Sequence, residues 1–138
     1  MKVKIKKLHP DAVIPRYAKP GDAGMDLTAV WQKQEFDLIT YGTGLSVEIP
    51  KGYVGLLFPR SSVYKAKMFL TNCVGVIDSG YRGEIMMKFE MMDSNAMYKT
   101  GDRVGQLIIM PYPQVEFEEV EDLTETNRGE GGFGSTGV

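Results

Sequence analysis

Apolar and polar residues alternate with a period of two along much of the chain. The alternation is clear over residues 2–6, 84–91 and 115–118. This pattern predicts short β-strands that bury one face and expose the other. Residues 54–58 and 107–110 are apolar almost throughout, which is typical of strands that are buried on both faces.

Turn-forming residues separate these predicted strands. Clusters of Gly, Pro, Asp and Asn recur about every eight to twelve residues, and such clusters mark tight turns. No segment carries a helical stripe, and residues 61–65 predict at most one short helical turn. We therefore expect an all-β fold, a sandwich or barrel of short antiparallel strands.

Length and charge limit the choice of partners. The 138 residues are enough for one domain. The net charge of −2 disfavours a nucleic-acid polymer as partner, so any anion site has to be local. The N-terminal residues lack the apolar stretch of a signal peptide, and no run approaches the length of a membrane span. We expect no membrane partner and a cytoplasmic location.

Two single residues exclude whole classes of chemistry. Cys73 is the only cysteine, so no internal disulfide can form, as expected in a reducing compartment. Its place in an apolar run predicts a small buried side chain rather than a nucleophile. His9 is the only histidine, so one chain cannot build a metal site of several histidines.

The C-terminal residues 128–137 have an unusual composition. Four glycines precede a Ser-Thr pair, which gives the segment little to bury but leaves its backbone N–H groups open to an anion. Arg128 offers a planar fork of donors to phosphate, and Phe133 offers a flat face to a ring. We divide the chain into a β domain, residues 1–127, and an arm, residues 128–138, that closes over a ligand. From the arm alone, a disordered terminus remains an equal alternative.

Four loops within the predicted β domain are rich in polar residues. They are residues 23–26, 59–62, 78–82 and 101–106. Each loop alone is explained by an ordinary turn or helix cap. Their presence together in one small β domain, where loops usually carry function, indicates a shared site.

A ligand with a triphosphate group suits these loops. Arg60 and Arg128 neutralise part of its charge, and Mg²⁺ held mainly by phosphates and waters makes up the deficit, with Asp26 as an acceptor for those waters. The hydroxyl groups that fill the remaining phosphate oxygens are those of Ser61, Ser62, Ser135 and Thr136.

Two residues of the third loop supply the remaining chemistry. Asp78 follows an apolar strand at a hairpin turn and is the best candidate to orient and deprotonate an attacking water. Tyr81 lies three residues further on and can pack against a sugar. The predicted reaction is attack on phosphorus, in which positioning and charge stabilisation contribute most.

Five ordered motifs give the chain a resemblance to the trimeric-type dUTPases, the deoxyuridine 5'-triphosphate nucleotidohydrolases. The resemblance spans nearly the whole chain, and five motifs in order are far more specific than any one glycine pattern. The motifs are Ala23-Gly-Met-Asp-Leu27, Pro59-Arg-Ser-Ser62, Gly75-Val-Ile-Asp-Ser-Gly-Tyr-Arg-Gly83, Gly101-Asp-Arg-Val-Gly-Gln-Leu107 and Arg128-Gly-Glu-Gly-Gly-Phe-Gly-Ser-Thr-Gly137.

The resemblance implies a distorted jelly roll, a barrel of the β-clip type, that assembles as a homotrimer. The C-terminal arm is then exchanged between subunits. Each active site draws motifs one, two and four from one subunit, motif three from a second and the arm from a third. The implied function is to hydrolyse dUTP to dUMP and pyrophosphate with Mg²⁺, which limits uracil in DNA and supplies dUMP for dTTP synthesis.

The family pattern also implies a role for each site residue. Asp78 activates the water that attacks the α-phosphorus, and Tyr81 leaves no space for a 2'-hydroxyl. Asp26 contacts the magnesium waters. The other implied contacts are Asn72, Gly75, Val76 and Ile77 with uracil, Met86 with the sugar, Arg60, Ser61, Ser62 and Gln106 with the phosphates, and Arg128, Phe133, Ser135 and Thr136 from the arm.

Two alternatives come from other classes of protein. The dCTP deaminases share the fold, and Gly80, where many dUTPases carry an acid, resembles their hairpin. Their catalytic glutamate, however, corresponds to Lys88, which is an unsuitable base. A nucleotide-gated binding or regulatory protein is the second alternative, although Asp78 and Arg128 are both retained.

Overall fold

The computed structural model describes residues 1–137, and Val138 lies outside the described residues. Within residues 1–137 no helix is long and apolar enough to span a membrane. The regular elements of this part of the chain are ten strands and one short helix: β1 (Lys4–Lys7), β2 (Met25–Thr28), β3 (Trp31–Glu35), β4 (Leu38–Gly42), β5 (Leu45–Glu48), β6 (Tyr53–Phe58), α1 (Val63–Ala66), β7 (Met68–Leu70), β8 (Gly75–Ile77), β9 (Met86–Met91) and β10 (Arg103–Pro111).

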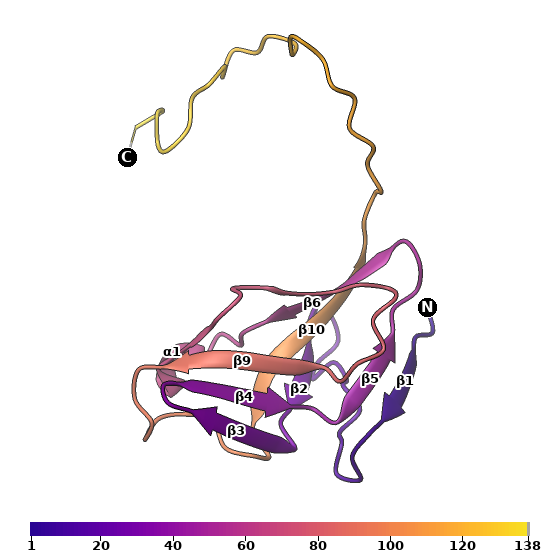
Figure 1. The fold of residues 1–138 in the computed structure, drawn as a ribbon, viewed down its shortest axis with the longest axis vertical. Coiled ribbons are helices and arrows are strands. Elements are labelled where there is room, and N and C mark those ends of the chain that lie inside the picture. The colour runs from indigo at the N-terminus through magenta and orange to yellow at the C-terminus, as the bar shows by residue number, and fades with distance from the viewer. Residues whose placement is uncertain (138) are drawn as a thin grey trace.

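The strands form two four-stranded antiparallel sheets and one two-stranded sheet (Figure 1). The first sheet has the order β2-β10-β6-β8, the second β3-β4-β9-β7, and β1 pairs with β5. The core contains buried side chains from both larger sheets, including Leu57 and Leu107 of the first and Ile39 and Phe89 of the second. This arrangement confirms the predicted all-β, jelly-roll-like fold of short antiparallel strands with one short helix.

Most predicted elements have counterparts in the structure. Residues 84–91 contain β9, where exposed and buried positions alternate as expected. Residues 54–58 lie in β6 and residues 107–110 in β10, but neither run is buried on both faces in this chain. The β6 run alternates between buried and partly buried positions, and only Leu107 of the β10 run is fully buried. The short helical turn expected over residues 61–65 is α1.

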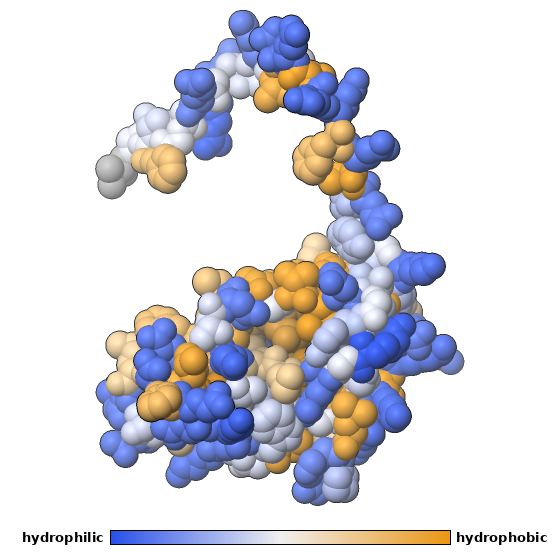
Figure 2. Space-filling model, in the orientation of Figure 1, coloured by the Kyte–Doolittle hydropathy of each residue, from blue (hydrophilic) through white to orange (hydrophobic). Residues whose placement is uncertain are grey.

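The strand predicted over residues 115–118 does not form within the single chain. β10 ends at Pro111, the backbone N–H of Tyr112 donates to Gly52 O at 3.1 Å, and residues 112–137 then run away from the body without a strand (Figure 1). Apolar side chains of this C-terminal segment stand in solvent (Figure 2), and Phe117 is 93% exposed. A strand needs a neighbour for its backbone groups, and the segment has none within residues 1–137.

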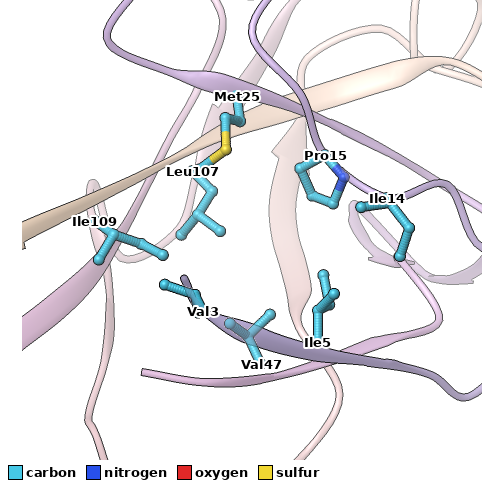
Figure 3. Close-up of a pocket in the computed structure, with 8 residues that line it drawn as sticks. All are labelled: Val3, Ile5, Ile14, Pro15, Met25, Val47, Leu107 and Ile109. Atoms are coloured by element: carbon cyan, nitrogen blue, oxygen red, sulfur yellow. The ribbon is translucent and has the colours of Figure 1, made fainter. Parts of the chain in front are cut away.

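A small apolar pocket lies beside β1, which pairs only with β5 among the described strands. Its volume is about 130 Å³. Figure 3 shows aliphatic side chains from β1, β5, β10 and the chain before β2 pointing into it. The residues that line it are Val3, Ile5, Ile14, Pro15, Met25, Val47, Leu107 and Ile109.

Three aromatic rings anchor the second sheet. Tyr41, Phe89 and Tyr98 meet edge to face with centroids 5.9 to 6.2 Å apart. Such contacts stabilise the fold beyond the burial of the rings themselves. The Tyr41 hydroxyl donates to Tyr98 O at 2.6 Å, and burial raises its pKa well above the usual value for tyrosine. The Tyr98 hydroxyl is buried without a hydrogen-bond partner among residues 1–137.

These two hydroxyl groups predict opposite effects of tyrosine-to-phenylalanine substitution. Tyr41→Phe removes a buried donor and leaves the Tyr98 carbonyl without this hydrogen bond, so the free energy of unfolding should fall by about 1–2 kcal/mol. Tyr98→Phe removes an unpaired buried hydroxyl, so stability should stay equal or rise. Urea denaturation at one fixed protein concentration checks both, and equal losses for the two variants would contradict this view of the core.

Candidate functional site

The larger of two candidate half-sites is a polar pocket at the end of β6, which we call the arginine pocket. Its volume is about 540 Å³. Loop 18–24, the end of β6 and the middle of β10 enclose it, so three of the predicted motifs converge here. It is lined by Ala18, Lys19, Asp22, Ala23, Gly24, Asp26, Arg60, Ser61, Arg103, Gln106 and Ile108.

Asp26 holds two arginines in the arginine pocket. Its Oδ1 accepts from Arg60 Nε at 3.1 Å, and its Oδ2 accepts from Arg103 Nη1 at 2.9 Å. Charge-assisted hydrogen bonds of this length fix the planes of the guanidinium groups. With Lys19 also lining the pocket, three cations face two carboxylates, which suits a ligand with several negative charges.

Gln106 and the serines complete this half-site. Gln106 donates from Nε2 to Pro59 O at 2.9 Å, and a Cβ on Gly24 would displace the end of its side chain from this position. Ser61 lines the pocket. Ser62 precedes α1, makes no side-chain cap hydrogen bond, and has its Oγ 3.4 Å from Arg60 Nη1.

A second pocket of about 320 Å³ lies where the chain turns from β7 in one sheet to β8 in the other, and we call it the hairpin pocket. Three predicted nucleoside contacts, Asn72, Gly75 and Met86, meet here. A Cβ on Gly75 would come within 3.0 Å of Leu57, so a larger residue would press on the leucine in this close pairing of β8 with β6. The lining residues are Thr40, Leu57, Leu70, Thr71, Asn72, Gly75, Met86, Met87 and Lys88.

The buried position expected for Cys73 is wrong. Cys73 is exposed in the turn between β7 and β8 and has a φ of 60°. The turn reverses the chain through a left-handed residue, and this carries the thiol away from the core although the residues that follow it are apolar.

The remaining motif-three residues lie beyond the hairpin pocket. Val76 is exposed and Ile77 is partly buried on β8, and Asp78 follows in an exposed turn. Tyr81 donates its backbone N–H to Asp78 O at 3.1 Å and its hydroxyl to Glu84 O at 2.9 Å. Its ring lies against Gly83, where a Cβ would overlap it. The tyrosine orientation is therefore fixed at both ends.

Strand register separates Asp78 from Arg60. β8 pairs antiparallel with β6, with Gly55 opposite Ile77 and Leu57 opposite Gly75. Asp78 consequently lies beyond the start of this pairing and Arg60 beyond its end. At about 3.3 Å per residue, roughly 20 Å of strand separates the two. One chain does not bring them together.

The predicted arm residues lie apart from both pockets. Arg128 Nε donates to Gly131 O at 3.0 Å, which is a contact within the arm. Phe133 is fully exposed with a φ of 51°, and Ser135 and Thr136 are exposed as well. In Figures 1 and 2 the end of the C-terminal segment stands clear of the body.

The acidic residues limit how a metal ion can bind. Within residues 1–137 no group of three or more His, Cys, Asp or Glu is placed to hold one. Asp22 and Asp26 are the acids that line the arginine pocket, and a carboxylate retains lone pairs beyond two hydrogen bonds. This donor set fits a cation held mainly by ligand oxygens and waters.

Sequence reasoning missed Arg103 and Lys19 as members of the site. Arg103 and Gln106 are three residues apart, so strict alternation predicts opposite faces for them. The structure has a register shift between Arg103 and Gly105, and such a bulge turns both side chains toward one pocket. The glycine within motif four was the signal available in the sequence.

Comparison with known proteins identifies relatives along the whole chain. The family model described as dUTPase matches residues 11–137. A deoxyuridine 5'-triphosphate nucleotidohydrolase of Hydrogenobaculum sp. (strain Y04AAS1) is 38% identical, with 100% of this chain and 99% of the relative covered. The protein of the same name from Cutibacterium acnes is 43% identical, with 94% and 88% covered.

The similar solved structures are also dUTPases. The dUTPase of Staphylococcus bacteriophage 80alpha with dUPNHPP is 29% identical, has a TM-score of 0.83, and is covered over 99% of each chain. A mutant dUTPase from phage phi11 of S. aureus, described as coordinating a structural Mg(II) ion, is 26% identical with a TM-score of 0.75. In that comparison 88% of this chain and 98% of the phage chain are covered.

The arginine pocket makes a prediction for anion binding. Arg103→Met removes one of its oriented cations, so affinity for inorganic pyrophosphate should fall by about tenfold or more, as expected for one charge-assisted hydrogen bond. Isothermal titration calorimetry measures this. Lys33→Met, which removes an exposed lysine of β3, is the matched control and should bind as the wild type does. Equal affinities for all three proteins would remove Arg103 from the site.

Proposed function

The chain belongs to the dUTPase family and hydrolyses dUTP, and we propose that water attacks the α-phosphorus to release dUMP and pyrophosphate. The observation that carries this mechanism is the presence of two half-sites with complementary chemistry in one chain. The arginine pocket suits a polyanion, and the hairpin pocket suits a nucleoside. The reaction limits uracil incorporation into DNA and supplies dUMP for dTTP synthesis.

The family assignment favours this activity over deamination of dCTP. The matching family model and the relatives described above are dUTPases. In addition, Lys88 lines the hairpin pocket at the place that corresponds to the deaminase glutamate, and an ammonium group is a poor base for activating water.

The arginine pocket holds the triphosphate in the proposed complex. Arg60 and Arg103 turn their guanidinium groups from Asp26 toward phosphate oxygens, and Gln106 and the hydroxyls of Ser61 and Ser62 take the remaining ones. Mg²⁺, if held by the phosphates, would supply further neutralisation of their charge. Asp26, released in part from the arginines, would be free to accept hydrogen bonds from waters around the ion.

The hairpin pocket selects the nucleoside. Backbone groups from Asn72 to Ile77 pair with the edge of uracil, and cytosine is excluded because its donors and acceptors are reversed. Met86 borders the sugar. Tyr81, fixed by its hydrogen bond to Glu84 O, packs against the deoxyribose where a 2'-hydroxyl would project.

Asp78 is the proposed general base. Its turn lies directly after β8, whose residues face the nucleoside, so its carboxylate is within reach of a water beside the α-phosphorus. The chain has a single histidine, His9, which lies in another part of the sequence. A carboxylate that orients and deprotonates water is sufficient in a reaction that depends mainly on positioning.

The strand register supports an active site shared between copies. Arg60 and Asp78 lie at opposite ends of the β6–β8 pairing, so a ligand that meets both has to bridge two chains. We therefore propose a homotrimer in which motifs one, two and four come from one subunit, motif three from a second, and the arm, residues 128–138, from a third. Closed symmetric assemblies of this kind are common.

The C-terminal segment supports the exchange of the arm. Val115 and Phe117 alternate with glutamates, are exposed in the single chain, and complement the lysine-flanked Val3, just before β1, and Ile5 within it. The apolar pocket beside β1 (Figure 3) is open to receive such side chains. In the proposed trimer, residues 113–118 pair with β1 of a neighbour and carry Arg128 and Phe133 over its substrate.

The cellular setting follows from composition. A single cysteine, Cys73, exposed in a turn, fits a reducing compartment. We propose that the enzyme acts in the cytoplasm.

The proposed function predicts a selective activity with one essential carboxylate. Purified protein with Mg²⁺ should release pyrophosphate from dUTP and not from dCTP or dTTP. Asp78→Asn keeps the shape of the side chain but removes the base, so turnover should fall by about 10²-fold or more, while affinity for a non-hydrolysable dUTP analogue is kept.

Each other outcome has a distinct meaning. Ammonia from dCTP would assign the chain to the deaminases. Binding without turnover of any nucleotide would favour a regulatory protein. Wild-type rates from Asp78→Asn would show that another group activates the water.

A further inference from the structure

The Asp78 carboxylate is not held in place by contacts of its own side chain. Within residues 1–137 it makes no side-chain hydrogen bond, and the direction of the side chain therefore follows the backbone of the turn, residues 78–83. The tip of that turn is Gly80, whose Cβ position opens on empty space. The backbone hydrogen bond from Tyr81 N to Asp78 O, at 3.1 Å, closes the turn. A turn of this kind needs an additional tie to hold a catalytic group in place.

Arg82 provides such a tie across the turn. Its Nη1 donates to Ser79 O at 2.8 Å and to Tyr81 O at 3.0 Å. One guanidinium group therefore joins the residues on both sides of Gly80. These two hydrogen bonds add to the one backbone hydrogen bond, from Tyr81 N to Asp78 O, that closes the turn.

Glu48 fastens this guanidinium group to the sheet. Its Oε1 lies 3.6 Å from Arg82 Nη2. Ser46, also on β5, donates from Oγ to Arg82 O at 2.7 Å. The turn that carries Asp78 is thus tied at two points to β5, a strand that contributes no predicted site residue.

We propose that Arg82, oriented by Glu48, is a positioning residue that aims the Asp78 carboxylate at the attacking water. The inference rests on the proposed role of Asp78 as general base and deepens it. It also explains how the turn can hold Asp78 despite Gly80, because the guanidinium group supplies the rigidity that glycine removes from the turn. Neither Arg82 nor Glu48 touches the substrate.

The geometry separates this role from ordinary stabilisation. The Arg82 and Glu48 side chains are 53% and 44% exposed, and exposed ion pairs contribute little to the free energy of folding. A small displacement of a catalytic group, in contrast, is costly for the rate. The loss should therefore appear in kcat and not in the melting temperature.

Three variants of the protein and one control variant test the proposal. Arg82→Lys keeps the charge but cannot bridge two carbonyls and Glu48 together, so kcat should fall by about tenfold to hundredfold. Glu48→Gln should cause a smaller loss, and the double variant should lose no more than Arg82→Lys alone. Glu35→Gln breaks the similarly exposed pair with Lys33 on β3 and is the matched control with wild-type kcat.

Four readouts decide the outcome. For Arg82→Lys and Glu48→Gln, KM, affinity for a non-hydrolysable dUTP analogue and melting temperature should stay at wild-type values while kcat falls. Weaker analogue binding would make Arg82 a substrate contact, and a lower melting temperature would make the pair merely structural. Either result, or a wild-type kcat, overturns the proposal.

Asp78→Asn distinguishes failure of this inference from failure of the proposed function. If Asp78→Asn is inactive while Arg82→Lys turns over at the wild-type rate, Asp78 is the base and the tie is dispensable. If Asp78→Asn turns over normally, the proposed mechanism itself fails.

Discussion

The antiparallel pairing of β6 with β8 is the constraint on which the arrangement of the site depends. Gly75 lies close against Leu57, and a Cβ at this glycine would press on the leucine. The register is therefore fixed by packing as well as by backbone hydrogen bonds. It places the cations that suit phosphate at one end of the strand pair and the carboxylate that suits water activation at the other.

A site divided in this way has to be completed by other copies of the chain. The same incompleteness is visible elsewhere in the molecule. β1 has an open edge and an apolar pocket beside it, and the C-terminal segment leaves β10 with Val115 and Phe117 in solvent. Burying this apolar surface is the driving force for association, and it brings the half-sites together at the same time.

The sequence predicted those features that depend on local pattern. Alternation identified β9, and continuous apolar runs identified β6 and β10. Motif spacing identified residues that the structure gathers into two pockets.

The predictions that failed depend on three-dimensional context. Cys73 left the core because a left-handed turn carries it outward, and residues 115–118 lack a partner strand. Arg103 was missed because a bulge in β10 breaks the alternation. The tie of Arg82 to Glu48 is a tertiary contact that no local pattern encodes.

Hybrid assemblies test the shared site most directly. An Arg60→Glu variant and an Asp78→Asn variant, each inactive alone, are co-expressed with different tags, and trimers that carry both tags are purified. If each site takes Arg60 from one subunit and Asp78 from the next, every hybrid trimer contains one intact site, so dUTP turnover should recover to about one third of the wild-type rate. Hybrids as inactive as their parents would show that each site lies within a single chain, which would contradict the division of the site along the β6–β8 pair.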